Sequence, residues 1–228
     1  MTAHVAYSTL DSSGAPATLS REQMSALLEA LEMPYLLMAM LMYGSGLRVM
    51  ECLQLRVHDV GIEAGTIHVH GKGAKDRIAA LPPETVALLT PHLETIRAEF
   101  EQDRGHDPAI TWADYYIFPS RELQVDPATR RIARGHINRN SIQNALSATA
   151  RVARIPVNVT PHCLRHSFAA HMFEDGTHIL TIQDLLGHAR LSTTMLYTHP
   201  MNQPGKRPES PLTTLRRKSF GDVSQQCT

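Results

Sequence analysis

The stretch LGHARLSTTMLYTH, residues 186–199, contains a phenol that could act as a nucleophile. Tyr197 lies among threonines and histidines, and a phenol of this kind needs a base or local positive charge before it can attack. An isolated tyrosine in such a setting is more often a half-buried side chain that packs through its ring. The stretch therefore gives a catalytic hypothesis that other parts of the chain must support.

A second group with possible chemistry lies on the helix predicted to begin at Pro161. At about 100° per residue, Leu164, Phe168 and Met172 form one apolar stripe. Arg165 falls at the edge of this stripe, and His162 falls one step further round. Both project from the first helical turn, where free amides and the helix dipole favour an anion. The alternative is a histidine and an arginine that are simply solvated at the helix rim.

Two further cations come from other segments. Arg48 follows a Gly-Ser-Gly turn among apolar neighbours, and Glu51 stands one helical turn later. Glu51 is either the structural partner of Arg48 or a group that orients it, so that the remaining guanidinium donors could bind a phosphate. Lys72 lies between glycines in GKGAKDR, a loop that could carry an ammonium into a site but is more often an exposed turn.

Motifs for metals and nucleotides are not indicated. His162 and His166 are four residues apart and flank Cys163, but the acidic residue of a zinc-binding HExxH motif is missing. No GxxxxGK[ST] loop is present, so the sequence does not predict ATP or GTP binding. The three cysteines, at 52, 163 and 227, have neither CxxC spacing nor the density of a disulfide framework. We therefore expect no cofactor and no metal.

The charge is balanced overall but uneven along the chain. Lys plus Arg equals Asp plus Glu, at 22 each. Residues 121–154 hold seven arginines against two acids, and residues 206–218 are also basic. Such faces could follow a phosphate backbone or could be ordinary solvated surface. No apolar run approaches the length of a membrane span and residues 1–20 do not look like a signal peptide, so we expect a soluble cytoplasmic protein without membrane contact.

The pattern of the chain predicts mainly α structure with a small antiparallel β-sheet, an α+β class. The sheet is a hairpin in TIHVHGKGAKDRIAALP, whose two arms alternate around a glycine-rich turn. Residues 1–18 favour a linker or disordered arm, and residues 102–116 show no period. Helices are expected from a Ser20–Gln23 capping box to about Leu31, over 34–44, after the GSG turn, over 83–101 and 140–154, from Thr160–Pro161 to Gly176, after a Thr177 cap, and after Ser192.

Taken in order, the candidate residues resemble the catalytic set of the tyrosine recombinases, also called the phage integrase family. The resemblance extends from about Leu19 to Pro200. It rests on the stretches YGSGLRVMECLQLRVHD, GKGAKDRIAALP, TPHCLRHSFAAHMFEDG and IQDLLGHARLSTTMLYTH. Within the family the chain looks most like an integron integrase, through YIFPSR, DPATRRIARGHI and RPESPL, with Xer-type and phage recombinases as near alternatives.

The resemblance implies a DNA recombinase without a cofactor, acting on DNA recombination sites as a homo-oligomer, a tetramer on DNA. It implies a catalytic domain over residues 19–200 and a C-terminal tail over 201–228. The implied roles are nucleophile for Tyr197, acid/base for His162, phosphate ligands for Arg48, Arg165 and His188, and proton donor to the departing 5′-oxygen for Lys72. The product would be a 3′-phosphotyrosyl intermediate.

The sequence departs from the family at two places, and its tail is expected to behave as the family's C-terminal segments do. Family members carry an N-terminal domain that clamps DNA, whereas this chain begins almost directly at the catalytic domain, so we expect weak DNA affinity. A truncated DNA-binding or assembly module is therefore the alternative. The segment that grips extrahelical bases in integron integrases is shortened here, with Trp112 as its stacking residue. In the tail, Leu212, Leu215 and Phe220 are expected to anchor on a neighbouring protomer.

Overall fold

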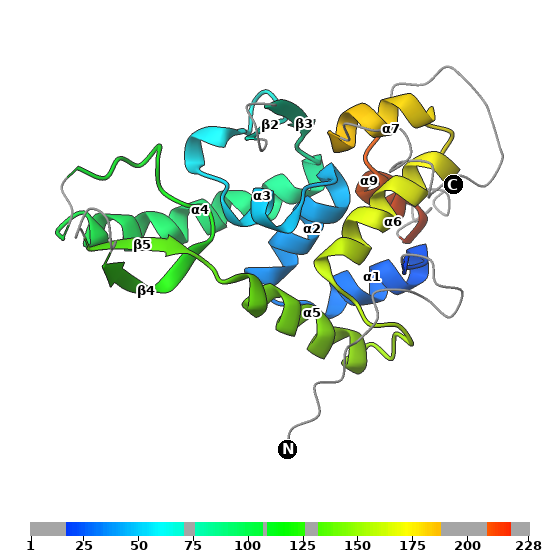
Figure 1. The fold of residues 1–228 in the computed structure, drawn as a ribbon, viewed down its shortest axis with the longest axis horizontal. Coiled ribbons are helices and arrows are strands. Elements are labelled where there is room, and N and C mark those ends of the chain that lie inside the picture. Colours follow the sequence, from blue (N-terminus) through cyan, green and yellow to red (C-terminus); the bar gives the residue numbers. More distant parts are fainter. Residues whose placement is uncertain (1–16, 71–75, 107–108, 126–131, 188–208, 220–228) are drawn as a thin grey trace, which may run out of the picture.

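The fold is mainly helical, as predicted, with antiparallel strands at one edge and one end (Figure 1). The computed structural model describes residues 17–70, 76–106, 109–125, 132–187 and 209–219. In these ranges the elements are α1 (Arg21–Ala30), α2 (Tyr35–Ser45), α3 (Val49–Leu53), η1 (Val57–Asp59), β1 (Val60–Gly61), β2 (Thr66–Val69), β3 (Arg77–Ala80), α4 (Pro83–Asp103), β4 (Pro119–Val125), β5 (Ile132–His136), α5 (Arg139–Val152), α6 (Pro161–Glu174), α7 (Ile179–Leu186) and α9 (Pro211–Ser219).

Capping side chains set the starts of three helices. Ser20 and Gln23 form the predicted capping box of α1, because each side chain bonds the other residue's backbone amide. Thr160 accepts a hydrogen bond from the Cys163 amide at the start of α6, also as predicted. Helix α7 differs from the prediction, since His178 rather than Thr177 caps it and accepts from the Leu180 amide.

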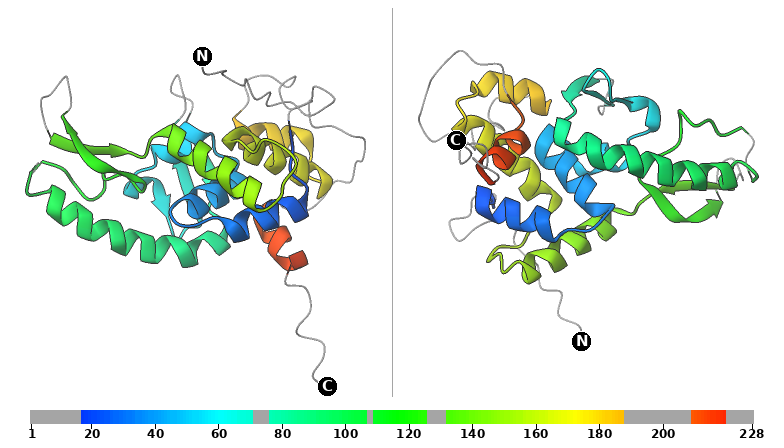
Figure 2. Two further views of the ribbon diagram at one scale, coloured as in Figure 1. Left: turned by 90° about the horizontal axis from the view of Figure 1, so that it is seen from below. Right: turned by 180° about the vertical axis from the view of Figure 1, so that it is seen from behind.

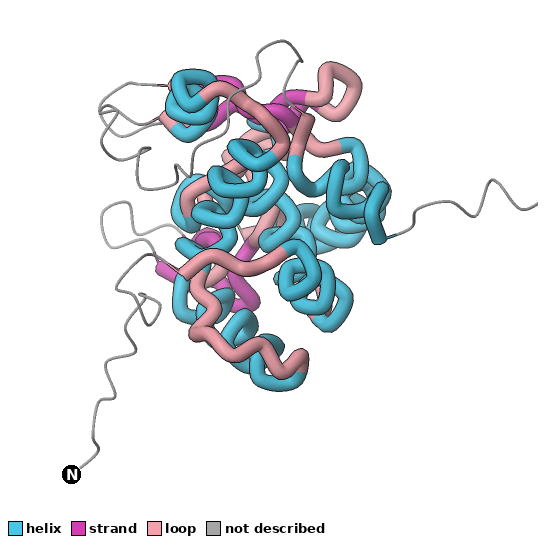
Figure 3. Tube along the Cα trace, turned by 90° about the vertical axis from the view of Figure 1, so that its right-hand side faces the viewer, coloured by secondary structure: helices cyan, strands magenta, loops and turns pink. Residues whose placement is uncertain are grey.

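The core is organised around α2, which is buried from Leu37 to Ser45 and packs along α6. Helices make up most of the folded body, and strands are few and short (Figure 3). Leu164, Phe168 and Met172 of α6 are each at most 3% exposed, which confirms the predicted apolar stripe. Because α2 is apolar on all sides, neighbouring helices must cover every face of it. Helices α3, α4, α5, α6 and α9 contact it and supply that cover.

Residues 211–219 form helix α9 in place of the extended tail that the sequence predicted. Leu212 and Leu215 are buried within this chain, where α9 contacts α1, α2, α4 and α6. The hydroxyl of Tyr43 donates to the Pro211 carbonyl and ties the start of α9 to α2. The two leucines therefore pack on their own chain, unlike the expected anchoring on a neighbour, because α2 offers them an apolar surface. Phe220 lies outside the described residues.

Strands within the described ranges form two small sheets rather than the single one expected. Strands β2 and β3, with Ile67 opposite Ala79, are the two arms of the predicted hairpin, and β1 adds a short antiparallel strand to β2 that was not predicted. Strands β4 and β5 form a second antiparallel pair that lies beside the far end of α4 (Figure 2). Arg134 of β5 binds both carboxylate oxygens of Asp103 at 2.7 and 2.9 Å and fixes this pair to α4.

The stretch between α4 and β4 packs its aromatic side chains on one another. Trp112 stacks on Tyr115, with ring centroids 6.1 Å apart, and meets Phe100 edge to face. The guanidinium of Arg97 covers the Trp112 ring at 4.8 Å from its centroid. The indole expected to stack on a nucleic-acid base is therefore already occupied by contacts within the chain.

No helix in the part of the chain that the structure describes combines the length and apolar character needed to cross a bilayer.

Candidate functional site

Three arginines from three different elements converge on one carboxylate. Glu51 of α3 accepts a hydrogen bond from Arg48 at 2.7 Å and two from Arg77 at 3.0 and 2.9 Å. The guanidinium of Arg165 lies 3.8 Å from the same carboxylate. We call these four residues the arginine cluster. It combines three positive charges with one negative charge, so it retains an excess of positive charge that an anion could neutralise.

Glu51 is ionised at the centre of the arginine cluster. Its side chain is 8% exposed, and burial alone would raise its pKa. The hydrogen bonds from Arg77 and from the Arg48 backbone amide outweigh burial and lower the pKa of Glu51 to about 2. The predicted orienting role of Glu51 thus has a geometric basis, although Glu51 binds Arg77 as well as Arg48.

Arg165 is fixed by backbone carbonyls at the bottom of the cluster. Its two terminal nitrogens donate to the carbonyl oxygens of Gly46 and Leu186, each at 2.6 Å. The residue is 7% exposed, so the alternative of an arginine solvated at the helix rim is wrong. Gly46 has a φ of +64°, and a Cβ there would lie 2.8 Å from the Phe168 ring. A glycine is therefore required at the position that presents this carbonyl.

Arg48 is the accessible member of the cluster. Its side chain is 42% exposed, and its backbone precedes the first turn of α3 as the N-cap residue. One terminal nitrogen binds Glu51, and the other lies 3.4 Å from the Gly187 carbonyl, a long hydrogen bond. An anion that arrives from solvent would therefore meet the Arg48 guanidinium with most of its donor capacity weakly engaged.

Arg77 is the member that sequence reasoning missed. It is the first residue of β3 and is 12% exposed at its side chain. Its Nε donates to the Leu185 carbonyl at 3.0 Å while its other nitrogens hold Glu51, so it joins β3 to both α3 and α7. The available signal was an arginine at the start of a strand in GKGAKDR, directly after a turn rich in glycine and lysine.

His162 is the exposed histidine on the first turn of α6. Partial desolvation and the charges of Arg139, Arg165 and Arg48 lower its pKa, which leaves the imidazole neutral at pH 7. A neutral imidazole can accept a proton, as a general base must. His166, one turn later, has its pKa lowered to about 4 by burial and by the charges of His162 and Arg165.

The structure thus brings together Arg48, Glu51 and Arg165, with His162 near enough to feel their charge. Lys72, His188 and Tyr197 lie outside the described residues. Arg77 follows residues 71–75 closely, and Gly187 directly precedes residue 188.

The helices around α2 thus carry an arginine cluster, and a neutral histidine stands at the start of α6. The phage integrase family matches residues 17–203, and the chain belongs to that family. An "Integrase/recombinase" of Escherichia coli is 35% identical over 88% of this chain and 64% of its own length. The XerD tyrosine recombinase of Staphylococcus epidermidis is also 35% identical, over 70% of this chain and 48% of its own length.

Solved structures agree on the fold. The XerA recombinase superimposes with a TM-score of 0.63 and 26% identity over 91% of this chain and 65% of that one. The catalytic domain of bacteriophage HP1 integrase matches with a TM-score of 0.51 over 93% of this chain and 99% of that domain, at 20% identity. The chain therefore spans 64% and 48% of the lengths of the Escherichia coli and Staphylococcus epidermidis relatives and nearly all of the HP1 catalytic domain.

Proposed function

We propose that this chain cleaves and rejoins DNA strands at specific sites, with Tyr197 as the nucleophile. The observation that carries the proposal is the arginine cluster, in which Arg48 and Arg165 share one ionised carboxylate and leave positive charge for a phosphate. Family membership supplies the reaction class. Tyr197, His188 and Lys72 enter from the sequence motifs, since they lie outside the described residues.

In the proposed reaction the Tyr197 oxygen attacks the scissile phosphorus and its phenolic proton passes to neutral His162. The bond from phosphorus to the 5′-oxygen breaks, and Lys72 gives that oxygen a proton. Arg48, Arg165 and His188 bind the non-bridging oxygens as negative charge grows, a contribution of about 3–4 kcal/mol for each well-placed donor. The phosphate remains joined to tyrosine at the 3′ end, so a 5′-hydroxyl can reverse the steps and rejoin a strand.

Arg77 limits how strongly Glu51 can hold Arg48. Because it binds Glu51 through two nitrogens, it takes up much of the carboxylate's acceptor capacity. Glu51 is then less able to compete with a phosphate for the Arg48 donors. We therefore assign Arg77 a positioning role, in which it balances the carboxylate that orients Arg48.

Within the family we propose an integron-integrase subtype, on the strength of the YIFPSR, DPATRRIARGHI and RPESPL stretches. XerD-type recombinases are as similar in identity, so substrate form is the discriminating property. An integron-type enzyme should bind a folded single-stranded site better than the same site as a duplex. The occupied Trp112 ring weighs against base stacking at that residue. Equal binding to both forms would favour the Xer type.

A nicked suicide substrate tests the enzymatic proposal. Cleavage beside the nick releases a short strand, so the phosphotyrosyl adduct accumulates and shifts the protein on a denaturing gel. We expect an adduct with the wild-type chain and with Tyr35→Phe, a matched tyrosine variant away from the proposed site. Tyr197→Phe should give none. An adduct that survives Tyr197→Phe would refute the assignment.

Arginine variants test the phosphate-binding role. Arg48→Ala should lower adduct formation at least about a hundredfold, because one preorganised donor group is lost. Its side chain is partly exposed, so far-UV circular dichroism should remain unchanged. Arg121→Ala removes an exposed arginine on β4 and serves as the control. If Arg48→Ala reacts like Arg121→Ala, the cluster is structural and does not bind the phosphate.

A DNA-binding or assembly module without turnover is the second candidate function. The formal net charge of zero favours it, since weak overall attraction to DNA limits how often a phosphate reaches the cluster. This candidate predicts a DNA complex in a low-salt gel shift together with no adduct on the suicide substrate. The tetramer on DNA belongs to the first proposal, and sizing of the protein–DNA complex by light scattering would test it.

A further inference from the structure

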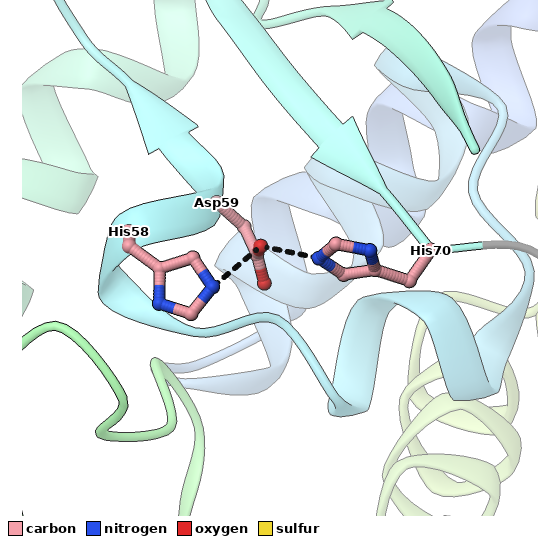
Figure 4. A group of neighbouring side chains, drawn as sticks. All are labelled: His58, Asp59 and His70. Carbon is pink, nitrogen blue, oxygen red and sulfur yellow. Dashed lines mark hydrogen bonds and ion pairs between the residues drawn. The ribbon is translucent and has the colours of Figure 1, made fainter.

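Two histidines and one buried aspartate, to which no role has been assigned so far, meet beside η1. His70, at the end of β2, places Nε2 2.9 Å from Oδ1 of Asp59, and His58 places Nε2 3.3 Å from the same oxygen (Figure 4). The three donor atoms lie within 4.8 Å of one another. The Asp59 side chain is 2% exposed, whereas both imidazoles reach solvent.

The hydrogen bond between His58 and the Ala113 carbonyl determines which ring nitrogen of His58 has its lone pair towards Asp59. Nδ1 of His58 lies 2.7 Å from the Ala113 carbonyl oxygen. A carbonyl can only accept, so Nδ1 carries the hydrogen and Nε2 of the neutral ring has a lone pair directed towards Asp59. Two lone pairs at 3.3 Å repel each other unless a positive charge stands between them. A cation bound between them would provide that charge.

Each of the three groups also has a partner on its remote atom. His58 donates through Nδ1 to Ala113, Nδ1 of His70 lies 3.3 Å from a carboxylate oxygen of Asp76, and Oδ2 of Asp59 accepts from the Arg56 amide at 2.8 Å. Metal-binding histidines characteristically use the second nitrogen in this way, with a carbonyl or a carboxylate as the partner. The orientation of the three donor atoms is therefore supported from behind.

We propose that His58, Asp59 and His70 form a binding site for a divalent transition-metal ion of the Zn²⁺ class. Two imidazole nitrogens and one carboxylate oxygen are ligands that Zn²⁺ accepts, with the remaining position open to water. At bond lengths of about 2.0–2.1 Å, adjacent ligands of a tetrahedral ion lie about 3.3 Å apart. The two separations from Asp59, 2.9 and 3.3 Å, are close to that value, and the exposed rings can rotate to complete the third.

The charge of the site also suits a cation. Asp59 and Asp76 place carboxylate oxygens 2.9 and 3.3 Å from the two ring nitrogens of His70. A bound metal ion would neutralise part of this negative charge. The site shares no residue with the arginine cluster, and no step of the proposed recombination depends on a metal ion bound there.

Cobalt and zinc titrations of the untagged full chain test the proposal. Co²⁺ in a site with few ligands absorbs visible light, so the titration reports coordination directly, and Zn²⁺ should displace it. We expect saturation at one equivalent. His58→Gln and His70→Gln should each weaken binding at least about tenfold, and Asp76→Asn should weaken it about tenfold through His70. The two histidines are largely exposed, so both variants should keep the wild-type circular dichroism spectrum.

His68→Gln is the matched control, because His68 is an exposed histidine of β2, two residues before His70, and lies outside the group of His58, Asp59 and His70. It should bind one equivalent as the wild type does. With 13 histidines in the chain, unspecific surface binding is the main competing explanation. Weak, non-saturating binding in the wild type would overturn the proposal, and so would unchanged affinity in His58→Gln and His70→Gln. Absence of a DNA adduct would bear only on the proposed recombination.

Discussion

Replacement of Glu51 by glutamine removes the negative charge at the centre of the arginine cluster with almost no change in shape. Arg77 and Arg165 are 12% and 8% exposed at their side chains, so both would keep buried charges without their carboxylate. Removal of one partner from a buried ion pair costs about 3–5 kcal/mol. The lowered pKa gives a similar figure, because a shift from 4.5 to about 2 corresponds to about 3 kcal/mol of stabilisation at neutral pH.

The same pKa sets the pH dependence of this effect. The folded-state pKa of Glu51 lies below its unfolded value, so its stabilisation is complete above about pH 4.5 and is lost as pH falls towards about 2. Urea unfolding of the wild type and of Glu51→Gln should therefore differ by about 3 kcal/mol at about pH 7. The difference should narrow by about 1.4 kcal/mol at about pH 3.5.

Glu63→Gln, at an exposed position in the turn after β1, is the control and should change stability by less than about 0.5 kcal/mol. The reasoning would be refuted if Glu51→Gln were as stable as Glu63→Gln at about pH 7. It would also be refuted if the stability difference were the same at both pH values, because the carboxylate would then not be the titrating group.

Three further predictions concern stability and can be read from the same urea unfolding curves. Gly46→Ala should lower the free energy of unfolding by about 2 kcal/mol or more, because the new Cβ would lie 2.8 Å from an aromatic ring. Gly65→Ala is the control: its φ of +62° is similar but the space around it is open, so it should lose only about 1 kcal/mol. Equal losses would contradict the steric explanation. Leu212→Ala should lower the free energy of unfolding by about 2–5 kcal/mol, because Leu212 of α9 is buried in the core. The control Leu180→Ala, at an exposed leucine, should lose less than about 1 kcal/mol. If Leu212→Ala were as stable as the wild type, α9 would not be docked in solution. Burial lowers the pKa of His171 to about 4, so the folded state binds fewer protons than the unfolded one, and this residue should cost about 3 kcal/mol of stability as pH drops from about 6.5 to about 4. His171→Gln should make the pH slope shallower by that amount and leave the slope of the other titrating groups, among them His166.

Features that depend on residues close together in one helix could be predicted from the sequence. The stripe on α6 and the caps at Ser20 and Thr160 depend on neighbours within a few residues. The burial of Arg165 was not predictable, since its partners, Gly46 and Leu186, are 119 and 21 residues away. Position on a helical wheel placed this arginine at the edge of a stripe but could not show what stood opposite.

The second sheet and α9 were missed for different physical reasons. Strand β4 has mostly exposed and half-buried residues, so it lacks the alternation that marks a strand with one buried face. Helix α9 did carry a usable signal, since Ser210 followed by Pro211 repeats the arrangement of Thr160 and Pro161 at the start of α6. The Ser210 hydroxyl indeed accepts from the Leu212 amide.

Arg21 gives the two ends of the folded body a mechanical connection. This first residue of α1 bonds Thr214 of α9 at 3.2 Å and Asp175, which follows α6, at 2.9 Å. Only residues 17–20 separate Arg21 from the part of the chain ahead of Ala17. A force applied there would therefore reach α9 through the bond between Arg21 and Thr214. A domain or partner attached at either end would therefore affect the docking of α9 rather than the core around α2.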